Sequence, residues 1–229
     1  MELDGTRLLT DPILRDRIVH LRALRRAPSR EELGRIDAVL ISHAHRDHLD
    51  VRSLRRLGND VPVVAAQAAV KSLRRRGFRG PVDAIEAGDE RTIGALGVHA
   101  TRAVHGRPGS AVGFLVRGTR TVYFAGDTDL FPEMEDLADP LDVALLPIWG
   151  WGPRLGEGHM NPERAAEAVR LLRPRIVIPI HWGSLHPIGM SRAAFLRDPP
   201  DTFVRVVRER APEADVRLLA PGETISLTG

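Results

Sequence analysis

Short apolar runs of strand length recur along the 229-residue chain and alternate with helical segments. Several runs, such as Asp142–Ile148 and Arg175–Ile180, are apolar at nearly every position, which is typical of strands buried on both faces. Alternating strands and helices predict a layered α/β domain with the helices outside the sheets. The predicted strands are Ile36–Ser42, Val61–Ala65, Val98–Val104, Ala111–Val116, Thr121–Ala125, Asp142–Ile148, Arg175–Ile180, Val216–Ala220 and Thr224–Leu227.

Helices are predicted between the strands, and the clearest one covers Asn161–Arg173. Asn161 suits the N-cap position, Pro162 the first helical position, and Glu163 the positive end of the helix dipole. Because no repeat, low-complexity segment or linker divides the chain, we expect one domain over residues 1–229. The other predicted helices are Val51–Leu57, Gln67–Arg76 and Thr202–Arg210, the last with Asp201 as its N-cap.

Composition excludes several classes of protein. Hydrophobic residues make up 43% of the chain and charged residues 28%, which is ordinary for a globular protein and argues against disorder. The sequence has no Cys, so thiolate zinc sites and Cys nucleophiles are excluded, and any metal must be held by His, Asp or Glu. No apolar run reaches the roughly 18 residues of a membrane-spanning helix, and the first residues do not resemble a signal peptide. We therefore expect a cytoplasmic protein.

The net charge of +3 does not indicate a nucleic-acid partner. The basic residues are nearly all Arg, and a genome-wide preference for Arg codons explains this usage as well as a function would. The densest basic run, Arg74-Arg75-Arg76, is interpreted as the solvated end of a helix.

The segment Ile13–Ala27 combines an apolar side with a basic one. Leu14, Ile18, Leu21 and Leu24 recur at helical spacing, with several Arg among them. Such a helix would lie on a membrane surface or face an anionic substrate. The favoured alternative is a surface helix packed on its own domain, or a partly ordered loop, because basic amphipathic patterns are only suggestive.

The stretch SHAHRDHLD begins at the end of the predicted strand Ile36–Ser42 and holds three His and one Asp within six residues. Residues two apart in an extended segment point to the same side, so His43 and His45 can converge on one point past the strand end. After a turn, Asp47 and His48 can face a second point nearby. Imidazole and carboxylate ligands suit zinc, iron and similar divalent ions. We therefore prefer a metal site over a chance coincidence in a polar loop.

Further potential ligands follow later strands. His105 ends the run Val98–Val104, while Asp127 and His181 each come directly after another apolar run. Each alone has an ordinary explanation, because an Asp after a strand is often a helix cap or turn residue. Together with the first cluster they make seven ligands at the ends of buried strands, where α/β active sites commonly lie.

The seven residues form one ordered pattern: His43-x-His45-x-Asp47-His48, then His105, Asp127 and His181. This pattern resembles the metallo-β-lactamase superfamily over almost the whole chain, and its order and spacing match the binuclear hydrolases. The resemblance implies an α/β (α+β) fold, a four-layer αββα sandwich with the metals at one edge of the two sheets. Further motifs resemble the branch of N-acyl-phosphatidylethanolamine phospholipase D-like and ascorbate-6-phosphate lactonase-like proteins. These motifs are Thr10-Asp11-Pro12, the run from Ile36 to His43, and the runs 124–128, 159–163 and 180–183.

The resemblance also implies two divalent metal ions, with zinc expected first and manganese or iron as alternatives. The family pattern assigns His43, His45 and His105 to site one, Asp47, His48 and His181 to site two, and Asp127 to both. The implied reaction is attack by a hydroxide held between the two ions on a small-molecule phosphodiester, phosphorylated lactone or related ester. The residues assigned to catalysis are Asp47, Asp127 and His159.

The segment Trp149–His159 is predicted to be a mobile substrate loop, because it follows a buried strand, is rich in Gly and holds two of the three Trp. The alternative is a surface loop whose Trp side chains fill the core edge. His159 and His186 are considered as proton donors to the leaving group or as anion ligands, while His159 would equally orient the next helix. Partners that orient the ligand imidazoles are expected among Ser42, Asp50 and Thr128.

The chain departs from the family pattern at its start. Relatives usually begin with a strand carrying a Gly-His pair, whereas here Met1 falls inside the Leu-Asp-Gly hairpin that follows. Either the chain is short at its N-terminus or the first strand is absent. An absent strand would expose a sheet edge that dimerisation could cover.

Two other functions remain open from the sequence. One is a mononuclear iron oxygenase of the same fold, resembling persulfide dioxygenases, which leave some of these ligands unused. The other is a non-catalytic metal-binding protein. Such a protein would typically have lost one or more ligands, whereas every expected position is filled in this sequence.

Overall fold

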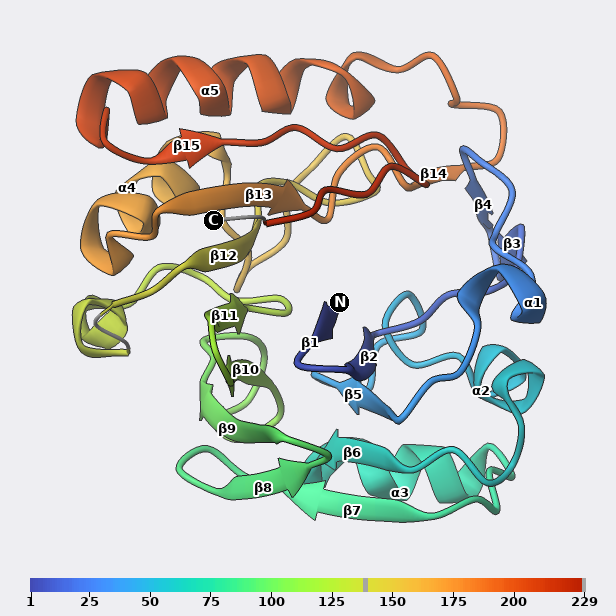
Figure 1. Ribbon diagram of the computed structural model, residues 1–229. Coiled ribbons are helices and arrows are strands. Elements are labelled where there is room, and N and C mark those ends of the chain that lie inside the picture. The colour runs from blue at the N-terminus through green and yellow to red at the C-terminus, as the bar shows by residue number, and fades with distance from the viewer. Residues whose placement is uncertain (138–139, 228–229) are drawn as a thin grey trace.

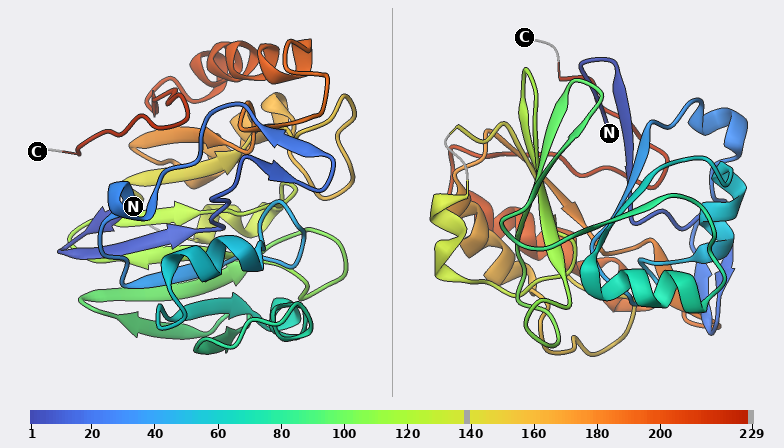
Figure 2. Two further views of the ribbon diagram at one scale, coloured as in Figure 1. Left: turned by 90° about the vertical axis from the view of Figure 1, so that its right-hand side faces the viewer. Right: turned by 90° about the horizontal axis from the view of Figure 1, so that it is seen from below.

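The computed structural model describes residues 1–137 and 140–227 of the chain. Two β-sheets lie face to face, and helices cover the outer face of each sheet (Figure 1, Figure 2). This four-layer αββα arrangement confirms the predicted fold class. The packing removes the apolar inner faces of both sheets from water, which is the dominant favourable contribution to folding.

The first sheet has five strands in the order β1-β2-β5-β6-β7. Strands β2, β5, β6 and β7 run parallel, and the two-residue β1 pairs antiparallel with β2 at the edge. Helices α2 (Val51–Leu57) and α3 (Gln67–Arg75) cover its outer face, and the short α1 (Arg30–Leu33) precedes β5 (Figure 2). The strands are β1 (Glu2–Leu3), β2 (Thr6–Thr10), β5 (Ala38–Ile41), β6 (Val63–Ala66) and β7 (Val82–Ile85).

The second sheet has seven strands in the order β15-β13-β12-β11-β10-β9-β8. Strands β8 to β11 form an antiparallel meander, whereas β11, β12, β13 and β15 are parallel. Helices α4 (Pro162–Leu172) and α5 (Asp198–Arg210) lie on the outer side of this sheet (Figure 1). The strands are β8 (Glu90–Ile93), β9 (Leu96–Arg102), β10 (Val112–Arg117), β11 (Thr121–Phe124), β12 (Val143–Pro147), β13 (Ile176–Ile180) and β15 (Asp215–Val216). Two 3-10 helices are η1 (Pro132–Asp136) and η2 (Ala194–Leu196).

Successive residues on the central strands of the second sheet face two different cores. Phe114 and Val116 of β10 lie in the core between the sheets, whereas Leu115 lies in the core beneath α4 and α5. On β11, Phe124 lies in the core between the sheets and Tyr123 lies in the core beneath α4 and α5. Because both faces of these strands are buried, their sequences are nearly continuous apolar runs.

The helix starts agree with the sequence in one case and differ in another. The Asn161 side chain caps α4, as predicted, by accepting a hydrogen bond from a backbone N–H three residues later at 2.9 Å. Helix α5 begins at Asp198, so the predicted N-cap Asp201 lies in its first turn instead. Pro199 and Pro200 fit that turn because their missing N–H groups would have no helical partner there. No helix in the described part of the chain is long and apolar enough to cross a membrane.

The segment at residues 13–27 is interpreted from the sequence as an amphipathic surface helix or a partly ordered loop. It forms a β-hairpin over residues 17–23, so the helix is wrong. Strands β3 (Arg17–Ile18) and β4 (Leu21–Ala23) pair with each other, and β14 (Leu185–Pro187) pairs with β4 to complete a three-stranded sheet. Ile18 and Leu21 are buried on the domain, whereas Leu24 is 41% exposed. Their helix-like spacing therefore arises from a tight turn between two short strands.

The two strands predicted near the C-terminus are mostly absent. β15 ends at Val216, and residues 217–227 form no strand. Pro221 has no N–H to donate to a sheet, and Gly222 adopts a φ of 95°, a conformation in which the chain turns. Leu218 and Leu227 consequently remain 41% and 39% exposed instead of packing in a core.

Candidate metal centre

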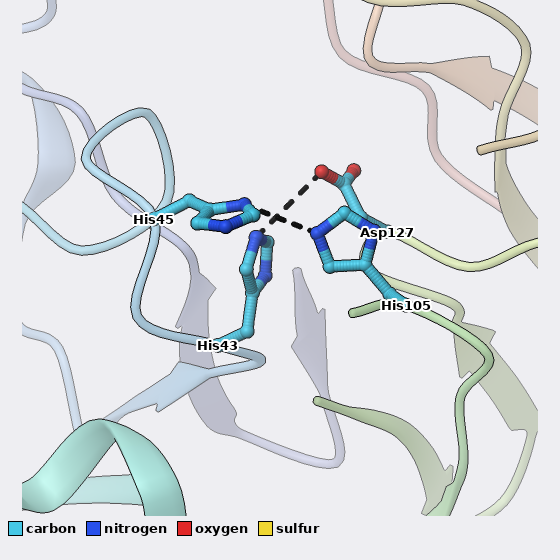
Figure 3. Close-up of side chains that lie close together, drawn as sticks. All are labelled: His43, His45, His105 and Asp127. Carbon is cyan, nitrogen blue, oxygen red and sulfur yellow. Dashed lines mark hydrogen bonds and ion pairs between the residues drawn. The ribbon is translucent and has the colours of Figure 1, made fainter. Parts of the chain in front are cut away.

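The predicted ligand residues meet at one edge of the two sheets, just past the ends of strands. His43 is the second residue after β5 of the first sheet, while Asp127 and His181 follow β11 and β13 of the second sheet. His105 follows β9 after a short connection. A backbone bridge between His43 and Ala111 joins the two sheets at this edge. Segments distant in sequence therefore converge on one place (Figure 3).

The first group of ligands consists of His43, His45, His105 and Asp127, and Figure 3 shows their side chains pointing toward one another. One ligand atom from each lies within 4.8 Å of the others. His45 Nδ1 is 3.0 Å from His105 Nε2, and His43 Nε2 is 3.7 Å from Asp127 Oδ2. His45 is exposed, so the group opens to solvent on that side.

The second group consists of Asp47, His48 and His181, whose ligand atoms also lie within 4.8 Å of one another. His48 Nε2 and His181 Nε2 are 3.0 Å apart. Asp47 Oδ2 lies 3.7 Å from the first of these nitrogens and 3.6 Å from the second.

Asp127 lies between the two groups. Its Oδ2 is 3.0 Å from His48 Nε2, and its Oδ1 is 3.3 Å from His181 Nε2, in addition to its contact with His43. The side chain is only 1% exposed. The structure therefore brings all seven predicted ligand residues together, with this carboxylate at their centre.

His159 also reaches the cluster. Its Nε2 lies 3.2 Å from Asp127 Oδ2, and its ring centroid is 4.7 Å from that of His105. Its Nδ1 faces the backbone carbonyls of Gly156 and Glu157 at 3.2 and 3.1 Å. Backbone contacts thus fix the direction of this ring toward the shared carboxylate.

The outward nitrogens of the ligand imidazoles are engaged by protein acceptors. His105 Nδ1 donates to the carbonyl of Gly158 and His181 Nδ1 to the carbonyl of Trp149, each at 2.9 Å. His48 Nδ1 contacts the carboxylate of Asp11 at 2.8 Å. Because these oxygens only accept, Nδ1 carries the proton in each ring, and Nε2 is a lone pair whenever the ring is neutral.

This tautomer pattern fits a bound cation. In their neutral forms, His48 and His181 would hold two lone pairs 3.0 Å apart, an arrangement that is repulsive unless a proton or a metal ion lies between them. Within the described residues, His43 Nε2 and Asp127 Oδ1 are also buried without a hydrogen-bond partner. Buried polar atoms are costly to leave unsatisfied, and imidazole nitrogen and carboxylate oxygen are both atom types that bind divalent metals.

The electrostatics of the cluster also fit a bound cation. Burial and the neighbouring imidazole of His48 lower the pKa of His43 well below its usual value, which favours the neutral, ligating form. Burial opposes the charged form of His48, but the carboxylates of Asp127 and Asp11 outweigh burial and raise its pKa well above the usual value. Burial likewise opposes the charged form of Asp127, yet the imidazoles of His181 and His48 hold the pKa of Asp127 well below its usual value. The cluster thus stabilises positive charge beside a buried carboxylate.

Asp11, part of the Thr10-Asp11-Pro12 motif, supports the metal centre in a way that the motif alone does not predict. It accepts from Ser42 N at 2.8 Å and from Ser42 Oγ at 2.5 Å, and it also holds His48. Ser42 Oγ in turn lies 3.0 Å from His43 Nδ1, so Ser42 does contact a ligand imidazole, as expected. Asp11 has a φ of 42°, an uncommon conformation for a residue other than Gly, and this strain marks a constrained position.

The other two residues expected to orient imidazoles have different roles. Asp50 caps helix α2 by accepting from Ser53 N at 2.9 Å, and it forms a two-point ion pair with Arg15. Thr128 Oγ1 accepts from Val104 N and donates to a neighbouring carbonyl, so it holds loops together. Both positions support the ligand loops without touching the imidazoles.

Residue 76, interpreted from the sequence as part of a solvated helix end, contacts the ligand loop. Arg76 Nη1 donates to the carbonyl of Leu49 at 2.9 Å, and its Nη2 donates to the carbonyl of Ala44 at 3.1 Å. One guanidinium thereby ties together the two ends of the segment 44–49, which carries three of the predicted ligands. His186 lies elsewhere, on β14, where its Nδ1 contacts the carbonyl of Pro187 at 2.8 Å.

The loop at residues 149–159 contributes backbone atoms to the centre. Its carbonyls accept from His181, His105 and His159, as described above. Trp149 Nε1 donates to the carbonyl of Gly152 within the same loop at 3.0 Å. The predicted role of this loop in covering the substrate stays a prediction, but its carbonyls do orient three imidazoles of the centre.

Comparison with known proteins identifies the family. A family model described as a beta-lactamase superfamily domain matches residues 6–182. A UPF0173 metal-dependent hydrolase from Caldivirga maquilingensis is 31% identical over 233 residues, which cover 99% of this chain and 93% of that protein.

Solved structures agree with this assignment. The structure of Igni18, a metallo hydrolase from Ignicoccus hospitalis, has a TM-score of 0.70 at 28% identity and covers 98% of this chain and 91% of its own. Isothiocyanate hydrolase from Delia radicum gut bacteria has a TM-score of 0.76 at 20% identity, and the match covers 100% of this chain and 95% of that protein. At this identity the match supports the fold alone. The narrower branch suggested by the sequence motifs stays a prediction. By its fold, its ligand cluster and these relatives, the chain belongs to the metallo-β-lactamase superfamily and, within it, to the UPF0173 metal-dependent hydrolases.

Proposed function

We propose that this protein is a binuclear hydrolase that cleaves a small-molecule phosphodiester, phosphorylated lactone or related ester. The observation that carries the proposal is the position of Asp127, whose two oxygens lie 3.0–3.7 Å from imidazole nitrogens of both ligand groups. A carboxylate can give one oxygen to each of two cations, so a single buried side chain can couple two sites.

The residues divide into three roles. His43, His45 and His105 would hold one ion, Asp47, His48 and His181 would hold the other, and Asp127 would contact both. Two divalent ions held in this way supply a nucleophile from water near neutral pH and stabilise the oxygen that gains charge. Asp11, Ser42 and the carbonyls of the 149–159 loop keep four of the imidazoles in the tautomer that presents a lone pair inward; these are His48, His43, His105 and His181.

His159 is the proposed proton donor to the leaving oxygen. Its Nδ1 is fixed by two backbone carbonyls, and its Nε2 faces the cluster without belonging to either ligand group. Because the two carbonyls hold the proton on Nδ1, only the charged ring has a proton on Nε2 to give. Burial opposes this charged form, but the carboxylate of Asp127 outweighs burial and raises the pKa of His159. A charged imidazole in that position can protonate a leaving group while remaining outside the metal coordination.

Metal content is the first test of this proposal. Protein purified without an affinity metal is analysed by inductively coupled plasma mass spectrometry, and close to two equivalents of zinc or manganese per chain are expected. One equivalent of iron would instead favour oxygen chemistry of the persulfide dioxygenase type. Absence of metal after reconstitution would contradict the ligand assignment.

The His159→Ala variant is expected to lower kcat by about 100-fold or more while both metal equivalents remain, because loss of a general acid typically has effects of this size. Turnover of bis(p-nitrophenyl) phosphate and of lactones is measured together with metal content. His99→Ala, a change on β9 outside the ligand groups, is the matched control. Unchanged kinetics in His159→Ala would make His159 a structural residue.

A further inference from the structure

Exposed apolar side chains gather on the small three-stranded sheet. The described residues include six large apolar side chains that are exposed, and four of them lie on this sheet or its turns. Single exposed apolar residues are ordinary, but a contiguous group next to a catalytic centre calls for a partner. The four are Val19 (53% exposed), Ile188 (51%), Leu24 (41%) and Met190 (39%).

Three of these residues lie on two turns that touch each other. The N–H of Ile188 donates to the carbonyl of His20 at 3.1 Å, which places the turn after β14 beside the turn between β3 and β4. The N–H of Met190 donates to the carbonyl of Pro187 at 3.0 Å and folds that turn back. We name Val19, Ile188, Met190 and the adjoining Trp151 the apolar rim.

The backbone at Val19 is strained. Its φ is 52°, and a β-branched residue with a positive φ is a genuine outlier. Such strain persists only where the surrounding structure enforces it, and it is enriched at functional sites. At this position it holds an exposed isopropyl group on the rim.

Two short segments connect the apolar rim to His181 of the metal centre: one is hydrogen-bonded to it and the other continues the chain from it. The ring of His20 packs edge-on against Trp151 with centroids 5.1 Å apart. Trp151 is two residues beyond Trp149, whose carbonyl accepts from His181 Nδ1 at 2.9 Å. Strand β14, which leads to Ile188, begins four residues after His181. The rim therefore borders the centre on the His181 side.

The size of the rim decides its occupant. A stable interface with a second copy buries about 1,200–2,000 Å² in total, which three or four side chains do not supply. A single alkyl or acyl group is of the right size for such a surface, and hydrophobic pockets typically distinguish substrates by individual methylene groups.

We propose that the apolar rim binds the alkyl or acyl chain of the substrate whose hydrolysable group lies at the metal centre. This inference rests on the proposed function and adds a substrate class to it: esters with a flexible apolar chain. Val19 and Ile188 act as specificity-determining residues, and they contribute to binding of the chain without touching the reacting atoms.

A binding series with a metal-directed head group tests the proposal without requiring turnover. Methyl- to hexylphosphonic acids are titrated calorimetrically into zinc-loaded protein. The affinity is expected to rise about threefold per methylene, or about 200-fold over the five added methylenes of the series, because each methylene leaves water. In the double variant Val19→Gly, Ile188→Ser the rise should shrink to a few-fold, while methylphosphonate binds as before. Gly suits the positive φ of position 19, so this variant keeps the turn.

The matched control is Leu218→Ser, which removes another exposed apolar side chain (41% exposed) outside the small sheet and should keep the full rise. An equal rise in affinity in the double variant would refute the proposal that the apolar rim binds the alkyl chain. If no phosphonate binds at all, the metal centre is not open to this head group, and both the proposed function and the present inference are refuted.

A dimer in sedimentation equilibrium that dissociates in the double variant would assign the rim to a second copy. Flotation with phosphatidylglycerol vesicles that is lost in the variant would assign it to a membrane surface.

Discussion

Replacing Asp127 by Ala is expected to abolish metal-dependent hydrolysis while the fold survives. The carboxylate is 1% exposed and lies within 3.7 Å of imidazole nitrogens from both ligand groups. Without it, neither of the two proposed ions would keep a full ligand set, and the proposed nucleophile would no longer form near neutral pH. Since metal ions contribute several kcal/mol to such reactions, kcat should fall by at least about 1,000-fold.

The Asp127→Ala variant should also bind less metal. Zinc equivalents after dialysis against a weak chelator, kcat, and the thermal unfolding of the metal-free protein are measured together. Asp129→Asn is the matched control, because Asp129 lies in the same loop but pairs with Arg164 at 2.6 Å. His45→Ala should lose turnover in the same way, through the exposed ligand of the first group. Turnover that persists in metal-free buffer would refute the mechanism for either variant.

The ligand residues could be predicted because each stands just past the end of an apolar strand. The buried strand β5 and the spacing of His43, His45 and His48 are both visible in the sequence, and the fold only had to bring them to His105 and Asp127. The central strands of the second sheet were equally visible, since strands buried on both faces have nearly continuous apolar sequences.

The role of Asp11 could not be predicted in this way. It acts on Ser42 and His48, which are 31 and 37 residues away, and it reaches them because β2 pairs in parallel with β5. Its conformation depends on this pairing and on a positive φ, neither of which a local pattern encodes.

The short strands at the sheet edges could not be predicted from the sequence either. β7 and β8 have few buried side chains, so their sequences show no run that stands out from a loop. The β3–β4 hairpin imitates a helix because Ile18 and Leu21 are both buried across a tight turn. Its partner strand β14 lies more than 160 residues later, so tertiary pairing decided its structure.

The loop at residues 149–159 shows how glycine can control a metal site without being a ligand. The carbonyl of Gly158 accepts from His105 Nδ1 at 2.9 Å, and the residue has a φ of 75°. A Cβ at this position would lie 2.9 Å from His105 Cα and 3.0 Å from its Nδ1. Real Cβ atoms essentially never make such short contacts with backbone, so either the loop or His105 has to move.

The Gly158→Ala variant is therefore expected to weaken metal binding at the first group by about 10- to 100-fold, the size typical of losing a partner that orients a ligand. The left-handed backbone of the substituted residue should also lower the free energy of unfolding by about 1–3 kcal/mol. Zinc titration against a competing chelator should then show one tight and one weakened site, because His48 and His181 keep their own partners.

The matched control is Gly152→Ala in the same loop, where φ is not in the left-handed region and the nearest contact of a new Cβ is an ordinary 3.8 Å. This control should keep both sites and full turnover. If Gly158→Ala also keeps both, the contact between Gly158 and His105 does not position the ligand. If both sites weaken together, the shared carboxylate of Asp127 transmits the shift of His105 to the second group, and the two ions act as one unit.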